Sequence, residues 1–167
     1  LNVLTTIKFS PPLLPGKQSA AELGHVNHCC KVHAEVANPD LRSFSGWSYN
    51  SVLGMLFGDG TTHAGNTHLV AFGPSYDTVR LNARANNCQA ALDAVRSFAP
   101  DHIKDIKRLI FHDWNDDEFA NGTWEFLRPE MATKYVDALR QRQGNVLFAS
   151  ADWATGWRGF IDGAIEE

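Results

Sequence analysis

The most informative stretch of this sequence is its C-terminal end, Asn145-Val-Leu-Phe-Ala-Ser-Ala-Asp-Trp-Ala-Thr-Gly-Trp-Arg-Gly-Phe-Ile-Asp-Gly-Ala-Ile-Glu-Glu167. Its first part, residues 146–149, is a short apolar run that predicts a buried strand. A turn of small residues with Asp152 follows, and the segment from Gly159 onward predicts the start of a helix. The free amides and the dipole at a helix N-terminus favour negative charge. This order of elements therefore predicts a binding site for an anion or a cofactor.

The rest of the chain predicts an α+β fold, with a mixed, mostly antiparallel sheet and flanking helices. We expect strands within residues 1–10, 29–36, 47–57, 68–72 and 106–111, and helices at residues 17–23, 87–98 and 131–143. Gly58-Asp59-Gly60 predicts a tight turn. Alternation along residues 29–36 places Cys30, Val32, Ala34 and Val36 on one face and Lys31, His33 and Glu35 on the other.

The bulk properties predict one domain with one continuous core and exclude some partners. The chain has 167 residues and a net charge of −4, which gives no electrostatic case for nucleic acid or an anionic membrane. No apolar run has the length of a transmembrane helix. The three cysteines include the adjacent pair Cys29 and Cys30, which favours free thiols in a reducing compartment. We therefore expect an intracellular location, cytoplasmic or peroxisomal.

Metal binding is not expected. His25, His28, Cys29, Cys30 and His33 crowd one segment, and these residue types bind zinc or copper. On a strand, however, neighbouring side chains alternate between two faces, so ordinary strand packing is the simpler explanation. The acidic loop that contains Asp113, Asp116, Asp117 and Glu118 lacks the spacing of a calcium loop and is expected to be solvated.

Several motifs in order carry a family resemblance. They are Phe9-Ser-Pro-Pro12, Gly24-His-Val-Asn27, Lys31-Val-His-Ala-Glu35, Gly58-Asp-Gly-Thr-Thr62, Gly65-Asn-Thr-His68, Phe111-His-Asp-Trp114, Gly122-Thr-Trp124, Phe148-Ala-Ser-Ala-Asp152 and Gly156-Trp-Arg-Gly-Phe-Ile-Asp-Gly-Ala164. Together they resemble the FAD-dependent amine oxidases, and the fungal monoamine oxidases most closely. The resemblance covers essentially the whole chain.

The resemblance implies a division of the chain by function. Residues 1–110 would belong to the substrate-binding domain, and residues 111–167 would contact the flavin and return to the FAD domain. The Gly-x-Gly-x-x-Gly turn that binds the pyrophosphate in the Rossmann half of such enzymes is missing here. The N-terminal Rossmann half is therefore expected to be absent from this piece and to be its partner in a larger protein.

Two aromatic residues and one lysine are the catalytic residues that the resemblance implies. Trp124 and Phe160 would form a near-parallel aromatic cage before the flavin that orients the amine nitrogen and excludes water. Lys31 would be buried in the active site and hold a water near the flavin. Met55 and Phe57 would line the substrate cavity.

The resemblance also implies the cofactor, FAD, and the residues that contact it. Thr123 stands where mammalian relatives have a cysteine linked to the flavin, so the FAD is expected to be non-covalent. The cofactor-binding residues would be Trp114, Thr123, Ala151, Asp152, Trp157, Phe160 and Ile161. Glu130 departs from the family pattern, because relatives commonly have glycine there.

The activity implied is oxidation of an amine to an imine, which hydrolyses to a carbonyl compound, with reduction of FAD and formation of hydrogen peroxide from oxygen. A flavin L-amino-acid oxidase is the alternative enzyme, with Arg128 and Arg158 as cations available for a carboxylate. A second alternative is that the isolated fragment is a non-catalytic binding domain. Apolar surface left exposed on such a piece predicts self-association, so a homo-oligomer is among the expected partners.

Overall fold

The computed structural model describes residues 1–49, 51–73 and 88–167, and they form two compact units. Unit 1 combines Leu1–Asn27 with Asp117–Glu167, and unit 2 is His28–Asp116. Each unit has its own cluster of buried apolar side chains. The expectation of one continuous core is therefore wrong, because the two ends of the chain pack with each other around a core of their own. The division by function at residues 110 and 111 stays a prediction.

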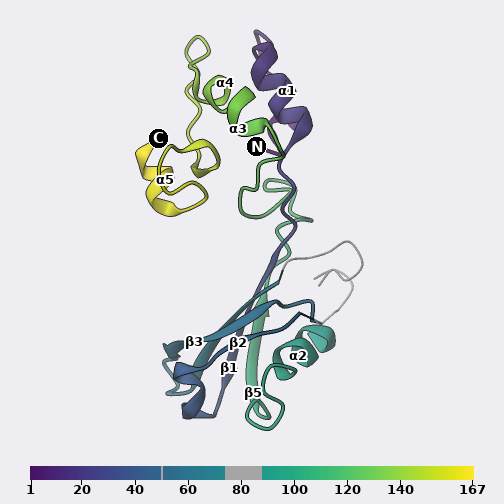
Figure 1. Ribbon diagram of the computed structural model, residues 1–167, viewed down its shortest axis with the longest axis vertical. Coiled ribbons are helices and arrows are strands. Elements are labelled where there is room, and N and C mark those ends of the chain that lie inside the picture. The colour runs from purple at the N-terminus through teal and green to yellow at the C-terminus, as the bar shows by residue number, and fades with distance from the viewer. Residues whose placement is uncertain (50, 74–87) are drawn as a thin grey trace. The chain divides into compact units, whose positions relative to one another are not determined.

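Unit 2 is built on an antiparallel sheet, which confirms the predicted α+β class. Its strands are β1 (Cys30–Val36), β2 (Ser45–Trp47), β3 (Met55–Thr61), β4 (Thr67–Gly73) and β5 (Ile106–Phe111), in the order β2-β3-β4-β1-β5 (Figure 1). Every described strand pair is antiparallel. A short helical turn, η2 (Pro39–Ser43), follows β1, and α2 (Cys88–Arg96) precedes β5.

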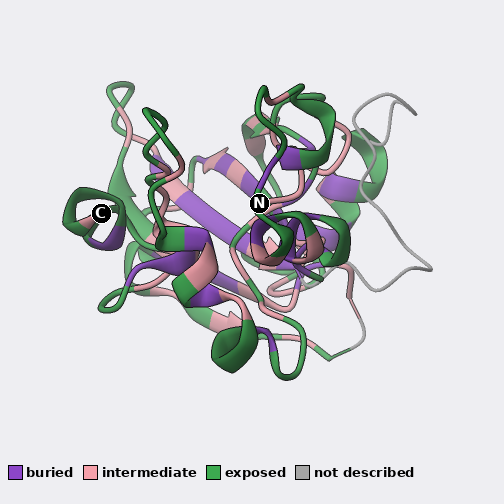
Figure 2. Ribbon diagram, turned by 90° about the horizontal axis from the view of Figure 1, so that it is seen from above, coloured by how far each residue is buried: buried purple, intermediate pink, exposed green. Residues whose placement is uncertain are grey.

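One face of the sheet forms the core of unit 2. Val32, Ala34 and Val36 of β1 are buried there, as the alternation of the sequence predicted. They pack with Leu56, Leu69 and Ala71 of the neighbouring strands and with Ala91 and Val95 of α2. Buried residues are purple in Figure 2, and purple runs along strands of the sheet. The other face of β1 carries Lys31, His33 and Glu35, which are exposed or half-buried.

Unit 1 contains the remaining helices: α1 (Pro15–Leu23), α3 (Met131–Lys134), α4 (Val136–Arg140) and α5 (Ile161–Glu166), with the short turns η1 (Leu4–Thr6) and η4 (Ala151–Trp153). Its core includes Ala20, Met131, Leu139 and Trp153. A fully buried cation, Lys17, joins α1 to α4, because its Nζ donates to the carbonyls of Ala138 and Leu139 at 2.6 and 2.5 Å. Burial lowers the pKa of Lys17.

Two strands predicted in unit 1 are wrong. Residues 1–10 contain only the turn η1, and residues 146–149 form no strand, with Leu147 exposed and Val146 in a single bridge to Gln143. The apolar run at residues 146–149 packs partly through Phe148, whose ring lies 4.2 Å from Lys17 Nζ. Leu4 and Phe148 thus pack in the core of unit 1 although neither belongs to a strand.

Other boundaries also differ from those predicted. The expected turn at residues 58–60 lies inside β3, whose register shifts between Gly58 and Thr61. The helix expected at residues 131–143 is divided at Tyr135 into α3 and α4. The helix expected at residues 87–98 is α2, and its predicted first residue, Asn87, lies outside the described residues. In the described ranges, no helix combines the length and the apolar character needed to cross a membrane.

Candidate functional site

The open face of the sheet in unit 2 gathers three of the predicted site residues. The register pairs Met55 with Phe72 and Phe72 with Lys31, so these three side chains form one row across β3, β4 and β1. Phe57 and His33 stand in the next row, on either side of Val70. Lys31, Met55 and Phe57 therefore share one face.

Phe72 is the member of this row that sequence reasoning missed. The Lys31 Nζ lies 4.9 Å from the centroid of the Phe72 ring, within the range of a cation–π contact. The Phe57 ring stacks on Phe72 at 5.7 Å between centroids. The strand that contains Phe72 was predicted, but only the register between strands places its ring beside Lys31. The expected burial of Lys31 is wrong for this chain, because its side chain is exposed.

A cavity of about 340 Å³ adjoins the Lys31 row and is mostly apolar in character. Met55 and Phe72 line this cavity together with two largely exposed aromatic residues, Trp47 and Tyr49. Its lining is Cys29, Trp47, Ser48, Tyr49, Ser51, Gly54, Met55, Phe72 and Gly73. Such a cavity suits the apolar part of a small molecule.

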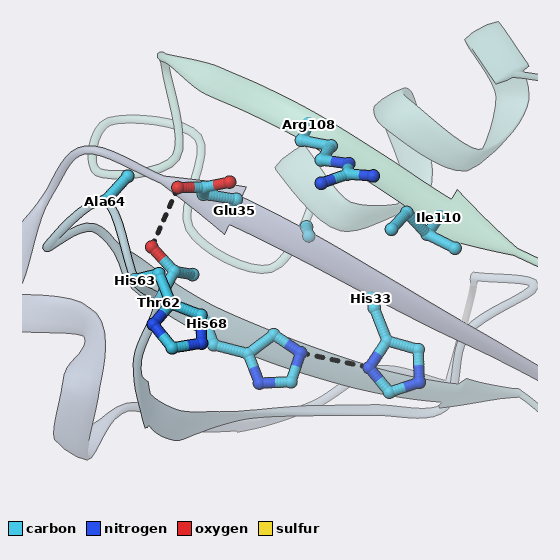
Figure 3. Close-up of a pocket in the computed structure, with 9 residues that line it drawn as sticks. His33, Glu35, Thr62, His63, Ala64, His68, Arg108 and Ile110 are labelled. Carbon is cyan, nitrogen blue, oxygen red and sulfur yellow. Dashed lines mark hydrogen bonds between the residues drawn. The ribbon is translucent and has the colours of Figure 1, made fainter.

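A second pocket, of about 300 Å³, lies farther along the same strands and is lined mainly by residues with polar side chains (Figure 3). The rings of His33 and His68 stack with centroids 5.2 Å apart, and His33 Nδ1 lies 3.0 Å from His68 Nε2. His68 Nδ1 lies 3.3 Å from the Asp59 carboxylate. Burial, aided by the nearby Lys31 and His68, lowers the pKa of His33.

Glu35 and Arg108 complete the polar pocket from β1 and β5, where they are register partners. Asn66 and Thr62 both donate to Glu35 Oε1 at 2.8 Å, and these hydrogen bonds lower the pKa of Glu35. The carboxylate is thus stabilised in its charged form. Sequence reasoning assigned no role to this pocket, although the polar side of β1 was visible in the alternation.

Trp114 lies in the loop after β5, also in unit 2. Its ring is half-exposed and contacts His112 edge-on at 4.4 Å. The loop is anchored by the buried Asp113, which accepts from the side chain of Asn115 at 2.7 Å, while Asn115 also donates to the Cys29 carbonyl. An exposed indole on an anchored loop suits contact with a flat partner.

Cys30, near this loop, is a free thiol. Burial, together with Cys29 and Asp113, raises the pKa of Cys30 to about 11, so this thiol stays protonated and unreactive at neutral pH. Within the described ranges, no three His, Cys, Asp or Glu side chains are placed to share a metal ion.

The C-terminal loop of unit 1 holds four of the predicted cofactor residues. The amide of Gly159 donates to the Ala151 carbonyl at 2.8 Å, and the amide of Phe160 donates to the Trp157 carbonyl at 3.0 Å. Ser150 Oγ accepts a hydrogen bond from the amide of Asp152, and Ser150 thereby caps the N-terminus of η4. The loop thus keeps Trp157 and Phe160 exposed, by 70% and 61%, with their rings edge-on at 5.8 Å.

Glycines allow this loop its shape. A Cβ at Gly163 would lie 2.5 Å from the Trp157 carbonyl oxygen, so α5 can approach the loop only without a side chain there. Gly159 has a φ of +79°, and a Cβ built on it would meet nothing within 4 Å. The backbone beside Phe160 and Ile161 is therefore open to a flat group.

Trp124 and Thr123 follow Gly122 in unit 1. A Cβ at Gly122 would lie 2.6 Å from His25 Cε1, so the chain passes tightly against this histidine. Thr123 Oγ1 donates to the Asn27 carbonyl at 3.4 Å, and Trp124 is 39% exposed. The near-parallel arrangement of Trp124 and Phe160 stays a prediction, since the ring that contacts Phe160 edge-on is Trp157.

Asp152 is half-buried within the turn η4. Ile161 is 80% exposed at the start of α5.

These residues fit a flavin by their chemistry. Exposed aromatic and apolar side chains on a hydrogen-bonded loop, with open backbone at Gly159, suit the flat ring system of such a cofactor. The residues of unit 1 that would hold it are Thr123, Ala151, Asp152, Trp157, Phe160 and Ile161. The role of Trp114, in unit 2, stays a prediction.

Comparison with known proteins agrees with this chemistry. The family model described as flavin containing amine oxidoreductase matches residues 1–167. A pseudooxynicotine dehydrogenase of a Pseudomonas species is 32% identical, over 99% of this chain and 33% of its own length. A nicotine dehydrogenase of Pseudomonas putida is 26% identical, over 99% of this chain and 33% of its own.

A solved structure of a putrescine oxidase shares the fold, with a TM-score of 0.81 at 20% identity, over 98% of this chain and 38% of that one. The chain thus spans about a third of the length of the curated relatives. Both relatives are bacterial, so the fungal affinity stays a prediction. The match over its full length shows that this chain belongs to the flavin-containing amine oxidoreductase family.

Proposed function

We propose that this chain forms the substrate-facing sheet and the aromatic cage of a flavin amine oxidase of the monoamine oxidase type, of the fungal kind, with FAD bound non-covalently. The observation that carries the proposal is the single sheet face that presents Lys31, Met55 and Phe57 beside an apolar cavity. The bound FAD would supply the chemistry of taking a hydride equivalent from the amine and passing the electrons to oxygen as hydrogen peroxide.

The residues of the chain bind, orient and desolvate the amine. Trp124 and Phe160 present their ring faces to the amine nitrogen and exclude water around it. Met55 and Phe57, with Phe72, bind the apolar part of the substrate. Lys31 donates a hydrogen bond to a water beside the cofactor. Orientation of this kind can supply a large part of a rate enhancement without any proton transfer by the protein.

The reacting amine must be neutral, because its nitrogen lone pair assists the loss of the hydride equivalent. Activity therefore rises with pH as the substrate loses its proton. A pH profile of kcat/KM that stays flat across the pKa of the amine would contradict the proposal.

The amino-acid oxidase alternative needs a cation for the substrate carboxylate. Arg128 Nε donates to the Leu23 carbonyl and Arg158 Nε to the Ala154 carbonyl, so both candidates are engaged with the backbone of unit 1. Paired assays with an amine and its matching amino acid separate the two activities.

The isolated chain is proposed to be inactive and to act only with the N-terminal FAD-binding half, in an intracellular compartment, cytoplasmic or peroxisomal. The aromatic and apolar groups it exposes, such as Phe119, Trp157 and Ile165, would favour a homo-oligomer when that half is missing. Sedimentation of the chain with and without the other half tests this.

The first experiment is an absorbance spectrum of the full-length protein between about 350 and 500 nm, where bound flavin absorbs, followed by acid precipitation. Yellow colour that leaves with the supernatant supports non-covalent FAD. Colour in the pellet would overturn the role given to Thr123, and no colour after adding FAD would favour a non-catalytic domain.

The cage is tested by Trp124→Ala, with Phe119→Ala as a control, because Phe119 is an exposed aromatic residue of the same unit. Loss of orientation is expected to lower kcat by about tenfold to a hundredfold for Trp124→Ala. The control should stay near the original activity. Equal activity of the two variants would refute the cage, and an oxygen electrode in the same assay tests oxygen as the electron acceptor.

A further inference from the structure

One side chain, Asn115, ties the loop after β5 to the start of β1. Its Nδ2 donates to the carbonyl of Cys29 at 3.2 Å and to Oδ1 of Asp113 at 2.7 Å. Its backbone amide donates to the same Asp113 oxygen at 3.0 Å. Asp113 is buried, and a buried carboxylate needs donors of this kind. Asn115 thus joins two segments that lie 86 residues apart in the chain.

The groups around Asn115 fix the direction in which its amide points. A backbone carbonyl and a carboxylate only accept hydrogen bonds, so the atom that meets Cys29 and Asp113 is Nδ2, which has two hydrogens to donate. The Oδ1 atom then faces His28 Nδ1 at 3.2 Å, and this ring nitrogen carries the proton that Oδ1 accepts. Both polar atoms of the amide therefore have partners, and all of these lie in unit 2.

Two parts of the proposed site adjoin this network. Trp114 directly precedes Asn115 and is half-exposed. Cys29 lines the apolar cavity with Phe72 and precedes Lys31 by two residues. Because Asn115 is bonded to both sides, the backbone that carries the indole is held against the wall of the cavity. Fixing a loop before it binds lowers the entropy that binding must remove.

We propose that Asn115 is a positioning residue that holds the Trp114 indole ready for contact with the flavin. This inference rests on the proposed function and deepens it, because it adds a residue that acts on the cofactor only through Trp114. Preorganisation of this kind strengthens binding without any contact between Asn115 and the flavin. Loss of Asn115 should therefore matter only while the indole is present.

The first test is a double-mutant cycle in the full-length protein, with FAD titrated into the apoprotein and followed by flavin fluorescence. Asn115→Asp keeps the shape of the side chain but replaces both donated hydrogens by an oxygen that repels the Asp113 carboxylate. It should weaken FAD binding by about fivefold to fiftyfold, and Trp114→Ala should weaken it at least as much. When Trp114→Ala is already present, adding Asn115→Asp should change binding by less than about twofold.

Fold-changes that multiply in the double variant would overturn the inference, because Asn115 would then act independently of the indole. Unchanged FAD binding in either single variant would overturn it as well. Where the protein still binds FAD and oxidises an amine, these outcomes leave the proposed function standing.

The matched control is Asn66→Asp. Asn66 Nδ2 also donates to a carboxylate, Glu35 Oε1 at 2.8 Å, and it lies in the same unit. It adjoins Thr67, which pairs with Val36 at the far end of β1 from Cys29. The same chemical change there should leave FAD binding within about twofold of the original. Equal losses in the two variants would show a general effect on unit 2 and contradict the role of Asn115.

A second measurement needs no flavin. It follows the indole N–H signal of Trp114 by NMR in the tryptophan-labelled full-length protein, with Trp114→Phe used to assign the signal. Asn115→Asp should shift or broaden this signal, and Asn66→Asp should not. Where Asn115→Asp fails to fold, His28→Phe serves instead, because it removes only the donor to Asn115 Oδ1 and should have a smaller effect of the same kind.

The two measurements separate the two ideas. If no flavin binds but the indole signal responds to these substitutions, the proposed function fails and the positioning by Asn115 stands. If the signal of Trp114 is the same in the original protein and in the variants at Asn115 and His28, the positioning fails.

Discussion

The two units show two ways in which a chain holds its functional side chains. In unit 2 a regular sheet does so, and alternation sends Val32 and Ala34 to the core and Lys31 and His33 to the open face. In unit 1 an irregular loop, fixed by backbone hydrogen bonds, holds Trp157 and Phe160 outward. A periodic scaffold can be predicted residue by residue, whereas an irregular one depends on contacts between distant segments.

The prediction with the largest expected effect compares how much a residue on each face of the sheet contributes to stability. Leu69 is buried in the core, and its neighbour His68 lies on the open face. Leu69→Ala should lower the free energy of unfolding by about 2 to 5 kcal/mol, because it leaves a cavity. His68→Ala should cost less than about 1 kcal/mol. Urea denaturation measures both, and similar losses would contradict the assignment of the faces.

A substitution at Lys17 tests whether its hydrogen bonds help to hold α1 against α4 in unit 1. Lys17→Met keeps most of the side-chain volume but removes the donor to the carbonyls of Ala138 and Leu139, so it should cost about 1 to 3 kcal/mol of stability. Lys8→Met, at an exposed lysine of the same unit, is the control and should change little. If urea denaturation gave the same free energy of unfolding for Lys17→Met as for the original protein, the hydrogen bonds of Lys17 would not be needed to hold α1 against α4.

Substitutions at Glu130 test the left-handed backbone conformation at the N-cap of α3. It has a φ of +69°, a conformation that glycine adopts more easily, which agrees with the glycine that the family resemblance implies at this position. Glu130→Ala keeps this strain and loses the exposed ion pair with Lys134, whereas Glu130→Gly loses the pair but relieves the strain. The glycine variant should be the more stable of the two by up to about 1 kcal/mol. Thermal unfolding that ranks alanine higher would argue against the left-handed backbone.

The smallest effect is a dependence of stability on pH. The pKa of His33 is lowered in the folded protein, so the unfolded chain binds its proton more readily. The contribution of His33 to stability is complete above the unfolded pKa of about 6.5 and is lost as the pH falls toward the folded pKa. Urea denaturation between pH 7 and 5 should give a shallow slope that His33→Gln reduces. A protein that gains stability on acidification would contradict this sign.

Gly58 shows how a motif can be recognised for the wrong reason. The sequence suggested a turn, yet Gly58 continues β3, and a Cβ there would lie 2.3 Å from the Arg42 carbonyl oxygen. The glycine permits close approach of η2 to the strand. Nothing local to residues 58–60 could reveal this, because the opposing backbone lies sixteen residues earlier in the chain.

The sequence by itself determined the α+β class, the two faces of β1, and the set of motifs that places the chain in its family. Local periodicity suffices for these, because a side chain's direction on a strand depends only on its position. Tertiary structure alone decided the division into two units, the loss of the strands expected at both ends, and the side-chain contacts that join Lys31 to Phe72 and His33 to His68. These depend on strand register and on packing between segments far apart in the sequence, which no local pattern encodes.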